Sequence, residues 1–182
     1  MNKKFSVAIM VETALCAALI CALSPFSIPL PFSPVPISLT IFAIYIALYA
    51  LGMKWGTVAC LLYILLGLVG IPVFASFTSG PGKLFGPTGG YIIGYIFVAL
   101  IAGFFIDKFP KKIYLHVIGM ILGVFICYTF GTLWFVHVMS DYTIAAALSL
   151  CVIPFIPADV VKIIVAVLVG PQIRKLIVKI NK

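Results

Sequence analysis

Residues 84–95 read LFGPTGGYIIGY, a Gly- and Pro-rich turn that runs directly into an apolar segment. No charged residue follows this stretch until Asp107. Irregular backbone at membrane depth is tolerated only where it is buried in protein or lines a cavity. The stretch therefore indicates a turn that is folded into a membrane protein, next to something that the protein binds.

The composition of the whole 182-residue chain agrees with a membrane location. Hydrophobic residues make up 64% of it, and only twelve basic and four acidic residues are present. A globular chain is about half apolar and about one quarter charged, so most of this protein's exterior must face lipid. We predict an all-α membrane protein in which residues 1–182 form a single transmembrane domain.

Apolar runs and the breakers between them predict six transmembrane helices, each close to the ~20 residues that a span needs. The expected spans are 5–23, 37–51, 55–71, 88–106, 113–136 and 158–177. A short turn at residues 52–54 separates the second span from the third. Pro157 is expected near the first turn of the last helix, where proline is tolerated.

The basic residues orient the bundle. Six spans place both termini on one side, and ten of the twelve Lys and Arg residues fall there. The positive-inside rule makes that side, with both termini, cytoplasmic. The positive charge thus reports topology, and no nucleic-acid partner is expected. Segments 24–36, 73–87 and 137–157 then face outside, and we predict that the proline-rich segment 24–36 caps a pocket.

Two acidic residues lie inside the predicted spans. Asp159 precedes Lys162 by three residues, so both occupy one face of the last helix near its outer end. An ionisable residue inside a membrane span usually has a function. We therefore interpret this pair as polar anchors for a ligand from outside rather than as a self-neutralising pair. Glu12 lies in the first span, where a structural role and a place in a coupling surface both stay open.

Stripes of small residues let membrane helices approach closely. For the glycine pairs we predict packing within the monomer, whereas the alanine stripe of the first span fits either internal packing or docking of another membrane subunit. The five cysteines have no metal-like spacing and are interpreted as buried hydrophobic residues. The stripes are Ala14, Ala18 and Ala22, Gly90 and Gly94, and Gly119 and Gly123.

Enzyme signatures are missing from the sequence. The pair Gly82-Lys83 resembles a P-loop ending, but that motif needs Gly at 77 and Ser or Thr at 84, where Phe77 and Leu84 stand. No HExxH or GxSxG is present. We therefore expect no catalysis, no cofactor and no nucleotide-hydrolysing site within this chain. Proton-coupled transport through an acidic residue stays an alternative, although no inverted repeat is visible.

Five motifs in order resemble the BioY family, the substrate-binding S components of energy-coupling-factor (ECF) biotin transporters. They are PVPISL at 34–39, LGMKWG at 51–56, LLYILLGLVGIPVF at 61–74, GPTGGYIIGY at 86–95 and FIPADVVK at 155–162. The resemblance covers nearly the whole chain. It departs from the family's usual small and apolar residues at Phe77 and Lys83.

The resemblance implies the six-helix ECF S-component fold and high-affinity capture of biotin from outside a prokaryotic plasma membrane. It also implies a membrane coupling subunit and two cytoplasmic ATPase subunits as partners, with the stripe Ala14, Ala18 and Ala22 docking the coupling subunit. Two alternatives stay open. One is a stand-alone secondary biotin carrier, and the other is a membrane enzyme acting on a lipid or vitamin precursor.

Residue chemistry is compatible with biotin as the ligand. Asp159 can accept from ureido N–H groups, and Lys162 can donate to a ligand oxygen, ureido or carboxylate. The backbone N–H groups of Gly89 and Gly90 begin a helix and suit an oxygen or an anion. For the aromatic residues, packing is an equal alternative to contact with the ligand rings. The remaining candidates are Tyr91, Phe74 and Phe85 as walls and Thr88 or Ser79 as hydrogen-bonding residues.

Overall fold

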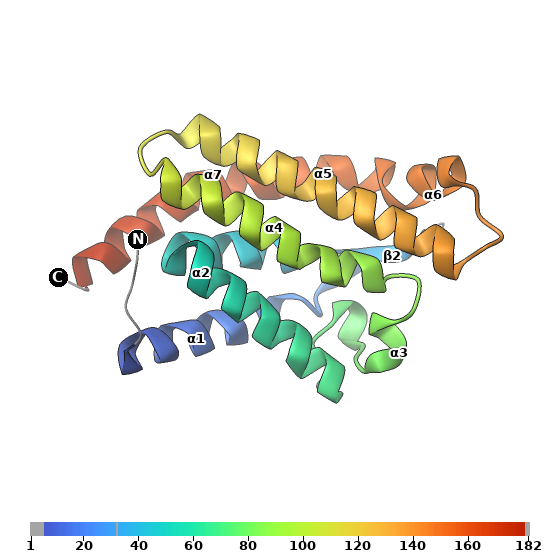
Figure 1. Ribbon diagram of the computed structural model, residues 1–182, viewed down its shortest axis with the longest axis horizontal. Helices are drawn as coiled ribbons and strands as arrows, with labels where there is room; N and C mark the ends of the chain where they lie inside the picture. Colours follow the sequence, from blue (N-terminus) through green and yellow to red (C-terminus); the bar gives the residue numbers. More distant parts are fainter. Residues whose placement is uncertain (1–5, 32, 181–182) are drawn as a thin grey trace.

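A computed structural model describes residues 6–31 and 33–180 of the chain. Figure 1 shows a bundle of long helices, with α1 beginning and α7 ending at the same end. The helices are α1 Val7–Leu23, α2 Thr40–Val69, α3 Pro81–Leu84, α4 Gly89–Lys108, α5 Ile113–Val138, α6 Ile144–Cys151 and α7 Ile156–Ile180. Two strands, β1 Ser27–Leu30 and β2 Ser33–Ser38, and two short 3-10 turns, η1 Ala75–Phe77 and η2 Ile153–Phe155, complete the described elements.

Helix α2 is two transmembrane passes joined at Gly52. This residue has φ 81° and ψ 179°, which no helix contains and which glycine adopts without a Cβ penalty. The two arms are in close contact near this break. A Cβ on Gly56 of the second arm would lie only 2.8 Å from Leu48 Cδ2 of the first. The predicted break at residues 52–54 is therefore confirmed.

Most of the long helices have the length and the polarity of membrane-spanning segments. Among the described residues, four helical segments are long and apolar enough to cross a membrane, with α2 counted as one, and α1 is a shorter apolar helix. Counting α2 as two passes, the six predicted spans are confirmed to within a few residues at each end. Pro157 is the second residue of α7, as expected. Large apolar side chains remain exposed around the bundle, where lipid would cover them.

Glycines let α4 pack closely against α5. A Cβ on Gly90 would lie 2.3 Å from Trp134 Cβ, and one on Gly94 would lie 2.7 Å from Cys127 Sγ. From the opposite helix, a Cβ on Gly119 would meet Phe105 at 2.6 Å, and one on Gly123 would meet Val98 at 3.1 Å. The prediction that both glycine pairs pack inside the monomer is confirmed.

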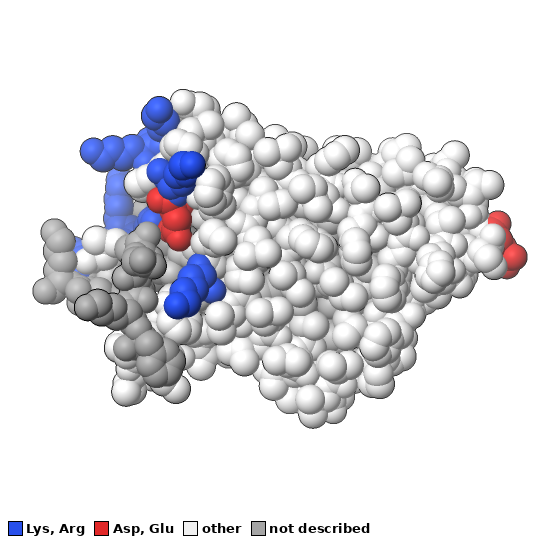
Figure 2. Space-filling model, viewed as in Figure 1, with Lys and Arg blue, Asp and Glu red and all other residues white. Residues whose placement is uncertain are grey.

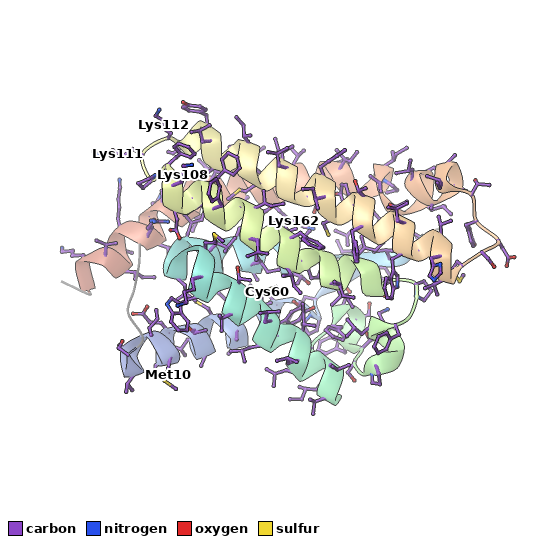
Figure 3. All side chains as sticks on the ribbon, in the orientation of Figure 1. Met10, Cys60, Lys108, Lys111, Lys112 and Lys162 are labelled. Carbon is purple, nitrogen blue, oxygen red and sulfur yellow. The ribbon has the colours of Figure 1, made fainter. Side chains whose placement is uncertain are left out.

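Charge is concentrated at one end of the bundle. Lys and Arg gather where α4 turns into α5, and most of the visible face is uncharged (Figure 2). Lys108, Lys111 and Lys112 mark this end in Figure 3, whereas Lys162 lies in the middle of the bundle. Under the positive-inside rule this is the cytoplasmic end. The opposite, outer end carries the β1–β2 hairpin, α3 and α6 (Figure 1).

One carboxylate ties three helices together at the cytoplasmic end. Asp107, near the end of α4, accepts from the Met53 N–H at 2.7 Å and from Arg174 Nη2 of α7 at 2.8 Å. It thereby satisfies a free backbone donor at the start of the second arm of α2. A substituent on Gly52 would reach this carboxylate, since its Cβ would lie 2.7 Å from Asp107 Oδ2.

The outer proline-rich segment is a β-hairpin, which corrects the all-helical expectation for this part of the chain. Strands β1 and β2 pair antiparallel, with Ser27 opposite Ser38 and an irregularity between Ile28 and Leu30. Proline is tolerated because each strand of a two-stranded ribbon has one unpaired edge. The hairpin contacts the loop after α2, where the Ser27 and Ser76 hydroxyls share a 2.9 Å hydrogen bond.

Candidate functional site

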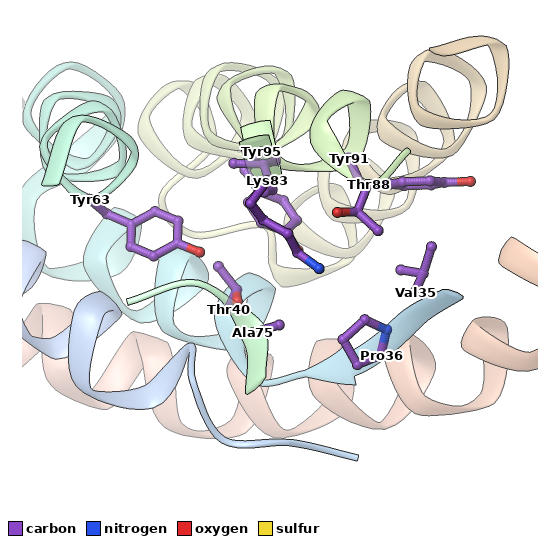
Figure 4. Close-up of a pocket in the computed structure, with 10 residues that line it drawn as sticks. Val35, Pro36, Thr40, Tyr63, Ala75, Lys83, Thr88, Tyr91 and Tyr95 are labelled. Atoms are coloured by element: carbon purple, nitrogen blue, oxygen red, sulfur yellow. The ribbon is translucent and has the colours of Figure 1, made fainter. Parts of the chain in front are cut away.

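Two small cavities lie beneath the hairpin at the outer end of the bundle. We call them the Lys83 cavity (Figure 4) and the Asp159 cavity, and each has a volume of about 30 Å³. Both are lined by Val35 and Pro36 of β2 and by Tyr91 and Tyr95 of α4. Segment 24–36 therefore does cap the cavities through its last two residues, as predicted.

A buried ion pair forms the polar wall of the Asp159 cavity. Lys162 Nζ lies 2.7 Å from Asp159 Oδ1, and the two residues are only 8% and 4% exposed. The hydroxyl of Tyr128, from α5, donates to the other oxygen of Asp159. Asp159 lies in the first turn of α7, where the helix dipole favours a negative charge. The predicted shared helix face is confirmed, and the pair lines a cavity rather than the lipid surface.

The Lys83 cavity has a different polar wall. Lys83 comes from the short helix α3, and Figure 4 shows its side chain extending into the space between Tyr63 and Thr88. Thr88 is buried, and its hydroxyl has no hydrogen-bond partner among the described residues. Tyr91 in contrast uses its hydroxyl in a 3.1 Å hydrogen bond with Thr132. The cavity thus presents one cation and one free hydroxyl between aromatic rings.

The GPTGG turn that marks the sequence positions these groups. Trp134 Nε1 donates to the Gly86 carbonyl at 3.0 Å, which fixes the turn against α5. Gly89 packs so closely that a Cβ would lie 1.6 Å from the Leu84 carbonyl oxygen. Glycine at this position lets α3 fold back onto the start of α4, and this holds Lys83 over the cavity.

The structure brings together only part of the predicted site. Asp159, Lys162, Tyr91 and Thr88 line the cavities. The other five candidates do not line either cavity, so their contacts with a ligand stay predictions. They are Gly89, Gly90, Phe74, Phe85 and Ser79.

Packing explains where these five residues lie. The Gly89 N–H donates to the Gly86 carbonyl at 3.0 Å, and Gly90 packs against Trp134. Phe74 is fully buried behind Tyr63, with ring centroids 5.6 Å apart. Phe85 is 64% exposed, and Ser79 is half-buried in the loop before α3.

Several lining residues escaped the sequence reasoning. Tyr95 is one of them, although it lies four residues after the predicted Tyr91, and that spacing, which is visible in the sequence, places both on one face of α4. Tyr128 and Lys83 carry no such local signal, because only the packing of α5 and α3 brings them to the cavities. In the sequence, Lys83 stands out only as a departure from the family pattern and as part of an incomplete P-loop ending.

The arrangement suits a ligand with an apolar middle and two polar ends. Tyrosine rings separate a neutral ion pair in one cavity from an uncompensated lysine in the other. A cavity of about 30 Å³ has room for roughly one water molecule, so the structure is in a closed arrangement. A larger ligand requires the hairpin or the wall side chains to move.

A second candidate surface lies on α1. Ala14, Ala18 and Ala22 are all exposed, whereas Thr13, Ala17 and Ile20 face the bundle. This exposure disfavours internal packing of the alanine stripe, and docking of another membrane subunit stays a prediction. The stripe lines an apolar groove of about 530 Å³, whose other wall contains Leu62 and Leu66 of α2.

Comparisons with known proteins agree on one family. The BioY family matches residues 1–179. The biotin transporter BioY of Thermotoga maritima is 37% identical over 151 residues, which cover 82% of this chain and 86% of that protein. BioY2 of Lactococcus lactis, a biotin transporter, is 32% identical over 169 residues, with 93% and 91% coverage. A crystal structure of the S-component for biotin from an ECF-type ABC transporter superposes with a TM-score of 0.83 at 32% identity, covering 93% of this chain and 92% of that one.

Proposed function

The chain belongs to the BioY family, and from this premise we propose that it is the biotin-binding S component of an ECF-type ABC transporter. It is a multi-pass membrane protein with the fold of such a component. We place it in the plasma membrane of a prokaryote, where it captures biotin from outside for ATP-driven uptake.

The observation that carries the proposal is the buried Asp159–Lys162 pair in a tyrosine-walled cavity beneath the β1–β2 hairpin. Burying two charges at membrane depth costs about 2.5–3.5 kcal/mol each, and the cost falls near the interface. A pair that only neutralised itself would need no cavity beside it. A ligand that forms hydrogen bonds with both Asp159 and Lys162 explains why this buried pair lines a cavity.

The ureido ring of biotin matches this pair chemically. Its two N–H groups are donors for the Asp159 carboxylate, and its carbonyl oxygen is an acceptor for the Lys162 ammonium. A ligand carboxylate is a poorer fit at the same place, because it would be repelled by Asp159. We therefore assign the ureido ring to the Asp159 cavity and the apolar thioether ring to the space between the tyrosines.

The α1 groove supports a membrane partner for this subunit. Helices associate in lipid through small residues that let their backbones approach, and the exposed stripe of Ala14, Ala18 and Ala22 provides such a surface. We assign it to the membrane coupling subunit of the transporter, which in turn carries two cytoplasmic ATPase subunits. The sequence contains no P-loop motif, so the energy for uptake has to come from those ATPase subunits.

Calorimetry with the purified, detergent-solubilised chain tests the proposal directly. We expect tight one-to-one binding of biotin, and no binding of thiamine or riboflavin as matched vitamin controls. A folded protein that ignores biotin would contradict the proposed ligand. Uptake of biotin by vesicles that contain this chain alone would instead favour the stand-alone secondary carrier.

A further inference from the structure

We propose that Lys83, together with Thr88, binds the carboxylate of the ligand and makes the protein select the free acid over its neutral derivatives. This inference rests on biotin as the ligand, and it adds a residue for the acidic end of that molecule. Three features of the cavity support it: the position of Lys83, the missing counter-charge of its ammonium, and the free hydroxyl of Thr88 beside it.

The backbone around Lys83 aims its side chain inward. Helix α3 follows Gly80, whose φ of 87° turns the chain, and the N–H groups of Lys83 and Leu84 both donate to the Gly80 carbonyl. The next turn is fixed by the hydrogen bond from Trp134 to Gly86. With both ends of this short segment anchored, the Lys83 side chain enters the cavity (Figure 4).

The ammonium of Lys83 has no counter-charge in the cavity. Within the described part of the chain it makes no ion pair and donates no hydrogen bond, whereas Lys162 is neutralised by Asp159. The residue is half-buried, and this burial lowers the pKa of its ammonium. A bound anion would offset the lost hydration of the ammonium.

Thr88 provides the second, independent observation. It is buried and lines the same cavity, yet its Oγ1 has no hydrogen-bond partner among the described residues. A buried hydroxyl without a partner is costly, so it marks a place where a polar ligand atom belongs. A carboxylate has two oxygens, one for the ammonium and one for the hydroxyl.

The shared walls of the two cavities give the ligand its direction. Val35, Pro36, Tyr91 and Tyr95 line both, so one ligand can extend from the Asp159 cavity into the Lys83 cavity once the walls move apart. Its ureido ring then lies at the neutral pair, and its carboxylate lies at the uncompensated lysine. The neutral ureido ring thus contacts a pair without net charge, and the negative carboxylate contacts a positive side chain.

Titration calorimetry of two ligands against three proteins tests this assignment. The ligands are biotin and biotinamide, which has the same shape but no charge. The proteins are the wild type, Lys83→Met, and Lys111→Met, a control that removes an exposed lysine at the opposite end. A charge-assisted hydrogen bond corresponds to a change of about 10- to 100-fold in affinity.

We expect the wild type and Lys111→Met to prefer biotin over biotinamide by about 10-fold or more. Lys83→Met should lose about 10- to 100-fold in biotin affinity and little in biotinamide affinity, so the preference disappears. Lys83→Arg, which keeps the charge, should retain part of the preference. Thr88→Val should weaken biotin binding about 2- to 10-fold, more than it weakens biotinamide binding.

Two results would overturn the assignment while leaving the proposed function intact. One is a wild type that binds both ligands equally, which needs no variant to interpret. The other is a Lys83→Met protein that loses both ligands to the same extent, or neither. A wild type that binds neither ligand would refute the proposed function, and the assignment of Lys83 with it.

Discussion

Breaking the Asp159–Lys162 pair on one side should destabilise the protein, and removing both charges should largely restore its stability without restoring biotin binding. In Lys162→Met, the Asp159 carboxylate stays 96% buried with the Tyr128 hydroxyl as its remaining side-chain donor. In Asp159→Asn, the Lys162 ammonium loses the negative charge that lies 2.7 Å from it. An uncompensated buried charge costs about 3–5 kcal/mol.

The double variant, Asp159→Asn with Lys162→Met, separates the structural role of the pair from its binding role. Neither charge needs to be desolvated in this variant, so the free energy of unfolding should return to within about 1–2 kcal/mol of the wild type. Two charge-assisted hydrogen bonds to the ureido ring are nevertheless gone. At about 1.5–3 kcal/mol each, their loss weakens biotin binding by roughly 10²- to 10⁴-fold.

Apparent melting temperatures in detergent, combined with titration calorimetry, measure both effects. A loss of about 3–5 kcal/mol corresponds to a drop of about 6–20 °C for a chain of this size. The Asp107–Arg174 pair at the cytoplasmic end is a matched control, since breaking it by Asp107→Asn should lower the melting temperature and leave biotin affinity unchanged. A double variant that binds biotin as tightly as the wild type would refute the binding role of Asp159 and Lys162.

Three further predictions concern the fold, the partner and pH. Gly52→Ala forces a side chain into φ 81° and against Asp107, so it should cost about 1–3 kcal/mol in thermal unfolding while biotin affinity stays unchanged. Ala18→Leu should leave affinity and melting temperature intact but abolish ATP-dependent biotin uptake in vesicles reconstituted with the coupling module; undiminished uptake would remove α1 from the interface. Biotin affinity should fall as pH rises through the pKa of Lys83 in the free protein, because the biotin carboxylate needs the charged ammonium. Burial holds that pKa below its usual value. Lys83→Met should abolish this pH dependence, which calorimetry at several pH values measures.

The transmembrane architecture is largely predictable from the sequence because its causes are local. Bilayer thickness sets the length of each apolar run, and basic residues orient the bundle. Gly52 breaks α2 through its own backbone freedom, and the three-residue spacing of Asp159 and Lys162 places them on one helix face whatever surrounds them. The glycine pairs also predict close helix packing, because their four-residue spacing can be recognised directly in the sequence.

The shape of the site was decided by contacts between segments far apart in the chain. A hydrogen bond between the Ser27 and Ser76 hydroxyls holds the hairpin against the loop after α2. A hydrogen bond from Trp134 to the Gly86 carbonyl holds the GPTGG turn against α5. No local pattern encodes these pairings, so the sequence does not predict the hairpin, and for Phe74 it leaves packing and ligand contact as equal alternatives. The direction of Lys83 has the same origin. Its charge is a property of the sequence, but only the anchoring of α3 between α2 and α4 turns that charge toward the cavity instead of toward water.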